Sequence, residues 1–67
     1  MIIVNLSTLV NLANVSIFQL PKELRKLEAF LNEHKIILEE ERYGVYTLTF
    51  PTYNDELIFK IKYAHIL

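Results

Sequence analysis

Apolar positions recur with the spacing of a helix between residues 21 and 34. They follow one another at steps of three, three and one: Leu24, Leu27, Phe30 and Leu31. This spacing puts them on one face, while most of the charged residues between them fall on the other faces. Pro21 suits the first helical position, because its missing N–H would lack a partner there in any case. The pattern predicts an amphipathic helix over about residues 21–34.

Three later stretches have the two-residue period of strands. Residues 36–42 begin with apolar positions and end in charged ones, and residues 45–50 alternate Tyr, Leu and Phe with Val and Thr. Residues 56–64 alternate in the same way and contain one apolar series: Leu57, Phe59, Ile61 and Tyr63. Gly44 is the only glycine and indicates a tight turn with a positive φ between the first two stretches. We therefore expect a meander of three antiparallel strands.

The first twenty residues support two interpretations. Several apolar positions from Leu6 onward are close to a helical period, whereas residues 2–4 and 15–18 are rich in the β-branched and aromatic residues of strands. The preferred interpretation is two short strands, joined either by a turn or by a single helical turn. The alternative is that the segment forms a helix. The expected fold class is α+β, with one helix packed on an antiparallel sheet made of the C-terminal meander and one or two N-terminal strands.

Composition limits the size and kind of the protein. The chain has 67 residues, which allows one small domain spanning residues 1–67. It is 52% hydrophobic and 22% charged, so it should fold instead of remaining disordered. It has no cysteine, which excludes disulfides, thiolate metal sites and cysteine nucleophiles. Because so small a core offsets little more than the cost of ordering the chain, we expect a partner or self-association to add stability.

Charge is distributed unevenly along the chain. All seven basic and eight acidic side chains lie between Lys22 and Lys62, and the first twenty residues carry none. Polar residues interrupt this opening segment too often for a membrane span, and it lacks the basic n-region of a signal peptide, so we expect a cytoplasmic protein and no membrane partner. So much uncharged surface should be covered by another protein surface. The expected partner-binding residues of this segment are Ile3, Leu6, Leu9, Val10 and Phe18.

An acidic rim is the second expected contact surface. Glu39, Glu40 and Glu41 form a run at the end of one predicted strand, and Asp55 lies in a predicted loop. Acidic clusters engage basic partner proteins through charge complementarity. These four residues complete the predicted partner-binding set.

The residues available for catalysis are few. The only histidines are His34, expected to cap the predicted helix, and His65, expected in the last strand. There is no HExxH, no glycine-rich phosphate loop and no GxSxG. A metal site would need a third ligand such as Glu33 or Asp55, and no spacing requires one. We therefore predict a protein that is not an enzyme and that has no metal and no cofactor.

Nucleic-acid binding is the alternative function. In the predicted last strand, Lys60 and Lys62 share a face, and the start of the predicted helix adds three more basic residues: Lys22, Arg25 and Lys26. The net charge of −1 argues against binding through bulk positive charge, and the acidic run would repel phosphates.

The preferred interpretation is a small protein–protein interaction module. We expect a homodimeric regulator or inhibitor whose partner is a second copy or a host protein. Enrichment in Ile, Lys, Asn and Tyr fits an AT-rich coding sequence, as in a phage or another mobile element.

Overall fold

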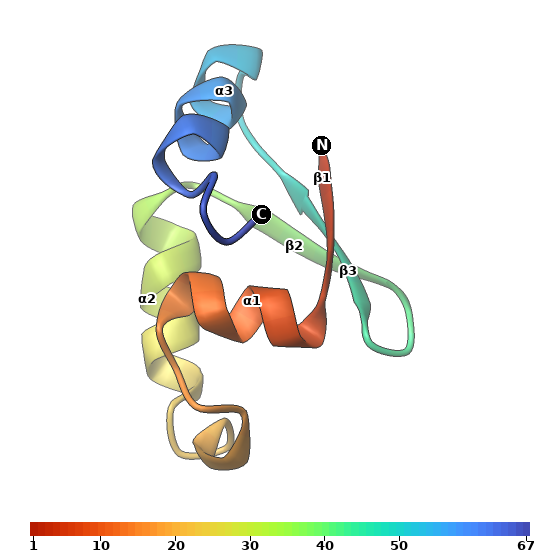
Figure 1. Ribbon diagram of the computed structural model, residues 1–67, viewed down its shortest axis with the longest axis vertical. Coiled ribbons are helices and arrows are strands. Elements are labelled where there is room, and N and C mark those ends of the chain that lie inside the picture. Colours follow the sequence, from red (N-terminus) through yellow and green to blue (C-terminus); the bar gives the residue numbers. More distant parts are fainter.

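Three short strands form one antiparallel sheet, and three helices lie against one of its faces (Figure 1). The computed structural model describes all 67 residues, and the strand order in the sheet is β1-β3-β2. The elements in chain order are β1 (Ile2–Asn5), α1 (Leu6–Ala13), the short 3-10 helix η1 (Ile17–Gln19), α2 (Leu24–Glu33), β2 (Ile37–Arg42), β3 (Val45–Thr49) and α3 (Tyr53–Lys62). The α+β fold class predicted from the sequence is confirmed.

The register of the sheet separates two faces. On the helix side, Leu48 of β3 lies between Ile2 of β1 and Leu38 of β2. On the opposite face, Thr47 lies between Ile3 and Glu39 in the same way. We call this second surface the helix-free face; the exposed isoleucines on it are Ile3 and Ile37. Successive side chains of a strand point to opposite faces, so Ile2, Val4 and Leu48 are buried on the helix side. On the helix-free face, Thr47 of the central strand is also buried, and the edge-strand residues Ile3 and Ile37 are exposed.

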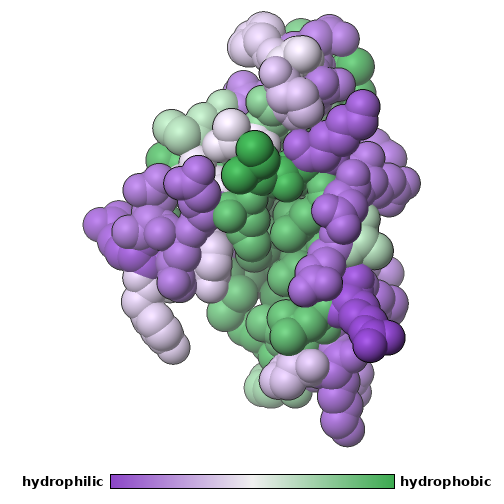
Figure 2. Space-filling view, turned by 180° about the vertical axis from the view of Figure 1, so that it is seen from behind, coloured by the Kyte–Doolittle hydropathy of each residue, from purple (hydrophilic) through white to green (hydrophobic).

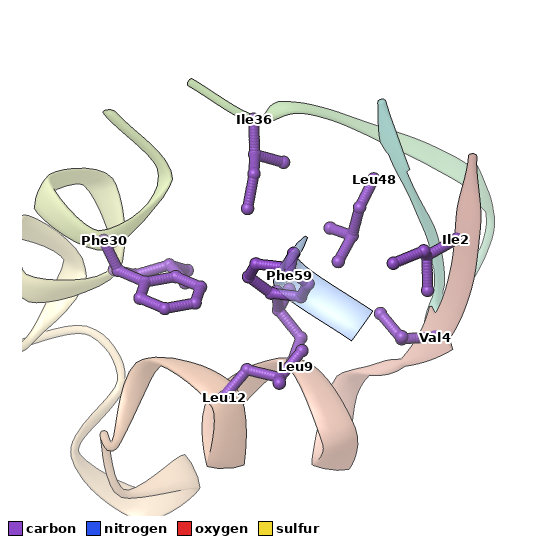
Figure 3. Packing of buried hydrophobic residues seen from close by; sticks show 9 residues of the cluster. Ile2, Val4, Leu9, Leu12, Phe30, Ile36, Leu48 and Phe59 are labelled. Atoms are coloured by element: carbon purple, nitrogen blue, oxygen red, sulfur yellow. The ribbon is translucent and has the colours of Figure 1, made fainter. Parts of the chain in front are cut away.

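The core lies between the sheet and the helices, with Phe59 near its centre (Figure 3). Phe59 is 2% exposed, and its ring lies 5.0 Å from that of Phe50 and 6.0 Å from that of Phe30. Leu9 of α1 and Leu48 of β3 are the most fully buried side chains around it. The three helices and the sheet therefore share a single hydrophobic cluster.

The β2–β3 hairpin follows the sequence prediction closely. Gly44 has a φ of 77°, a conformation that costs glycine little and other residues more, and it joins strands predicted at 36–42 and 45–50. The register shifts between Glu40 and Arg42, so β2 carries a bulge near its end.

Helix α2 is shorter than the predicted helix over residues 21–34. Pro21 lies in the turn that precedes it, so the expected proline at the first helical position is wrong. Leu27 and Phe30 are buried and Leu31 is half-buried, as expected for the apolar face of the predicted helix. Leu24 in the first turn stays 47% exposed. None of the helices has both the length and the apolar composition needed to cross a membrane.

The strand predicted over residues 56–64 is wrong, because this segment forms most of α3. Thr52 caps the helix: its hydroxyl oxygen accepts the Asp55 N–H at 3.1 Å. Asp55 and Glu56 lie in the first turn and Lys60 and Lys62 in the last, an order that the helix dipole favours.

The opening segment also differs from the preferred interpretation. It contains one strand, β1, followed at once by α1, and the second strand expected at 15–18 is absent. The Asn5 side chain accepts the Thr8 N–H at 2.8 Å and so begins the helix directly at the end of the strand. Asn14, in the left-handed region with φ of 57°, ends it.

Replacement of Phe59 by alanine tests the central role of its ring. We expect Phe59→Ala to lower the free energy of unfolding by about 3 to 5 kcal/mol, because it leaves a cavity among the surrounding rings. The neighbouring Ile58→Ala, at a side chain 55% exposed, should change it by about 0.5 kcal/mol or less. Urea unfolding followed by circular dichroism measures both, and Phe59→Leu gives an intermediate loss if the alanine variant does not fold.

Candidate functional site

The outer edge of β1 has no strand beside it. β1 pairs with β3 alone, and an open hollow of about 480 Å³ runs along its other edge. All four residues of β1 line this hollow, and the opposite wall comes from α1, α3 and the C-terminal turn: Thr8, Lys60, Ala64 and Leu67. The backbone edge of a strand is therefore accessible inside a mainly apolar hollow.

Helix α3 presents apolar side chains beside this edge. Four residues spaced three, one and three positions apart share one face of the helix and of the turn after it: Leu57, Lys60, Ile61 and Ala64. Ile61 is 72% exposed and Leu57 is 41% exposed. The opposite face of α3 carries Phe59 into the core, so the helix is apolar on two sides but packed on one only. We call the free edge of β1 together with this face of α3 the β1 side.

A buried carboxylate holds the two parts of the β1 side together. Glu56 of α3 is 6% exposed and pairs with the amino group of Met1. The Lys60 ammonium lies 3.8 Å from the same carboxylate. These contacts place the start of β1 against α3 and leave Lys60 as the one charged side chain of the hollow.

The other edge of the sheet differs in charge and geometry. β2 ends in four consecutive charged residues, Glu39 to Arg42, and contains the bulge described above. Charges and bulges are the usual protection of an exposed edge against pairing with another strand. β1, with the sequence Ile-Ile-Val-Asn, has neither protection.

The structure places the expected apolar contact residues in different environments. Ile3 is 63% exposed on the helix-free face, and Leu6 is half-buried at the start of α1. Leu9 and Val10 are 1% and 4% exposed, which removes them from any contact surface. Phe18 is 93% exposed but lies in η1, far from α3 (Figure 1). The expectation that the whole uncharged segment needs a partner is therefore wrong, since α1 buries much of it within the same chain.

The predicted acidic rim is divided among three places. Glu39 and Glu41 flank Thr47 on the helix-free face, and the Thr47 hydroxyl donates to Glu41 at 2.7 Å. Glu40 lies opposite Tyr46 on the helix side. Asp55 accepts a hydrogen bond from the Thr52 hydroxyl at the start of α3. The structure thus brings Ile3, Glu39 and Glu41 onto one face and separates the other two.

The basic residues of the nucleic-acid alternative are not gathered on one surface. Lys60 and Lys62 lie two positions apart in a helix and therefore point to different sides, whereas in the predicted strand they would share a face. Lys22, Arg25 and Lys26 surround the start of α2, toward the other end of the molecule (Figure 1).

His34 caps α2, as predicted, and packs in an aromatic cluster. Its Nδ1–H donates to the Phe30 carbonyl oxygen at 3.0 Å, and its Nε2 lies 3.5 Å from the Tyr63 hydroxyl. A hollow of about 220 Å³ beside it is lined by Phe50, Phe59 and several charged side chains. His65 is exposed in the turn after α3, where a strand was expected. No group of three or more His, Asp or Glu side chains could hold a metal ion.

A hydrophobic strip runs along the back of the molecule. Figure 2 shows it between two hydrophilic margins. The half-buried side chains of Leu20, Leu31 and Leu38 pack against the central cluster. We interpret the strip as the open margin of that cluster.

The sequence pattern does not predict the exposed face of α3. Leu57 and Ile61 were assigned to a strand because their alternation with polar residues has a period of two. The pattern Thr52-x-x-Asp55 ahead of an apolar run was the available signal, since it resembles the capping box that begins helices.

Replacement of Tyr46 by phenylalanine tests the electrostatics of the sheet. Burial raises the pKa of the Tyr46 hydroxyl above 10.0, and the negative charge of Glu40 raises it further. As the pH rises, the unfolded chain loses this proton at a lower pH than the folded chain does. The contribution of Tyr46 to the free energy of unfolding is therefore complete below about pH 10 and is lost above it. We expect Tyr46→Phe to reduce this alkaline loss and Tyr53→Phe, at a side chain 74% exposed, to leave it unchanged. Urea unfolding at about pH 8 and about pH 11 measures the difference, and equal losses in both variants would contradict it.

No protein-family model, curated protein or solved structure matches the chain. The β1 side is therefore interpreted from its own residues, charge and exposure.

Proposed function

We propose that the protein is a non-enzymatic protein-interaction module that associates with a second copy of itself through the β1 side. The observation that carries this proposal is the combination of an unprotected strand edge with an exposed apolar helix face beside it. Its expected role as a regulator or inhibitor, its cytoplasmic location and its origin in a phage or mobile element stay predictions.

The strand edge supports the proposal through its unpaired backbone groups. An exposed edge presents a row of N–H and C=O groups that pair readily with another chain. Proteins that remain monomeric usually protect such edges, as β2 is protected here by charges and a bulge. An interaction edge must stay open, and β1 is the edge that does.

The apolar face of α3 supports the proposal through its exposed area. Single exposed hydrophobic residues are normal on a protein surface, whereas a contiguous group usually marks an interaction site. Leu57 and Ile61 of α3 share a helix face with Lys60 and with Ala64 of the following turn, and the last two line the hollow beside β1. Burying them in an interface would add to the small core of the single chain.

Sedimentation velocity and light scattering at low micromolar concentration test the proposed function. We expect a mass of two chains that falls toward one chain on dilution. Ile61→Glu should raise the dissociation constant about tenfold or more, because it introduces a charge into the buried contact. Phe18→Glu is the matched control, since Phe18 is 93% exposed but lies outside the β1 side. A wild-type protein that stays monomeric over the whole concentration range would contradict self-association.

A further inference from the structure

Alternate residues of β1 direct their backbone N–H and C=O groups toward β3 and toward the free edge. The Leu6 N–H, directly after the strand, donates to the Gly44 carbonyl oxygen at 3.0 Å. In an antiparallel pair, successive residues alternate between bonding to the neighbouring strand and facing away from it. Ile2 and Val4 have the same orientation as Leu6 and therefore bond toward β3. The N–H and C=O groups of Ile3 and Asn5 face the free edge.

We infer that β1 pairs antiparallel with β1 of a second copy, with Ile3 opposite Ile3 of that copy. This inference rests on the proposed function and specifies its geometry. A strand that pairs with its own copy about a twofold axis places one position opposite itself. Met1, Ile3 and Asn5 have the same orientation, and Ile3 is the central one of the three. In this register the two Ile3 residues exchange two N–H···O=C bonds. Asn5 of each copy then donates its N–H to the Met1 carbonyl oxygen of the other.

The side chains of β1 fit this arrangement on both faces. A twofold axis perpendicular to the sheet keeps the helix side of one copy continuous with the helix side of the other. Ile2 and Val4 of each copy stay in their own core and line the hollow of about 480 Å³ beside β1, where Ala64 forms part of the apolar wall. Lys60, the one charged side chain there, covers apolar surface with its aliphatic stem and keeps its ammonium in water. On the helix-free face the two exposed Ile3 side chains become neighbours.

Charge decides which edge a second copy can use. Two β1 strands meet without any like-charged side chains, because the first twenty residues carry no charged side chain. Two β2 strands would bring the runs Glu39–Glu41 together, and like charges directly opposite one another are destabilising. A second copy is thus complementary to β1 and repelled at β2.

The area available agrees with a stable dimer. A standard interface buries roughly 800 Å² on each partner, which is about one sixth of the 4862 Å² that this chain exposes. One side of a molecule with extents of 32 × 23 × 21 Å supplies a surface of this order. Ile3 lies on the β1 edge, and Leu57 and Ile61 lie on the face of α3 that also carries Lys60 of the hollow, so apolar side chains are available to the contact as well as backbone groups. The dimer then has one continuous sheet in the order β2-β3-β1-β1-β3-β2.

Charge variants at Ile3 test the register directly. Ile3→Glu and Ile3→Lys each place two like charges opposite one another, so each variant alone should have a dissociation constant raised about 100-fold. An equimolar mixture of the two should form a heterodimer, because opposite charges then face each other. Ile37→Glu is the matched control: Ile37 is 60% exposed on the same helix-free face, but on the other edge strand. Sedimentation velocity measures association, and circular dichroism confirms that each variant folds.

A cysteine pair gives an independent measurement. The chain has no cysteine, so a disulfide in Ile3→Cys can join only two copies at this position. Hydrogen-bonded antiparallel partners have Cα atoms about 5.5 Å apart, within the range that a disulfide spans. We expect Ile3→Cys to form a covalent dimer in air and Ile37→Cys to remain a single chain on a non-reducing gel.

The outcomes separate this inference from the proposed function. If the wild-type protein is a dimer and Ile3→Glu binds its copy as tightly as wild type, the inference is overturned while self-association stands. If Ile3→Glu and Ile3→Lys are both monomeric but do not associate when mixed, Ile3 does not face itself and the register is overturned. A monomeric wild-type protein rejects the second copy as occupant together with the proposed self-association.

Discussion

The packing of Phe59 against the aromatic rings of α2 and the end of β3 is the contact on which the rest of the structure depends. It joins the last helix to both the sheet and α2, and its ring lies close to those of Phe30, Phe50 and Tyr63. Because this contact uses one face of α3, the apolar face that carries Leu57 and Ile61 stays outside the core. The feature that completes the fold therefore also creates an exposed apolar surface next to β1.

The unequal protection of the two sheet edges connects the fold with the proposed function. A three-stranded sheet necessarily has two edges, and here one is charged and bulged while the other is uncharged and open. The helices lie on one face and form only one wall of the open hollow beside β1, so the edge of β1 has no strand beside it. Glu56 holds Met1, the residue before β1, against α3, so the edge and the helix face are presented together. A small domain can in this way keep a strand available for pairing without unfolding any part of itself.

The site was only partly predictable from the sequence. Ile3 was expected to contact a partner and is exposed on the edge strand, but Leu9 and Val10 were expected beside it and are buried in the same chain. Low charge identifies residues that avoid water, yet it does not distinguish burial within a subunit from burial between subunits. Leu57 and Ile61 were not expected at a surface, because in a strand they would share the core face with Phe59. Lys60 and Lys62 were grouped for the same reason.

The sequence by itself determined the α+β class, helix α2 and the β2–β3 hairpin, because helical spacing over residues 24–31 and a lone glycine between alternating strands are local signals. Only the tertiary structure decided between strand and helix over residues 56–62, where the alternation of Leu57, Phe59 and Ile61 coincides with a helix that buries Glu56 and Phe59. A period of two and a period of 3.6 cannot be distinguished over so short a segment with apolar residues on several sides. The choice was made by the space that Phe59 fills between Phe30 and Phe50, which no neighbouring residue in the sequence specifies.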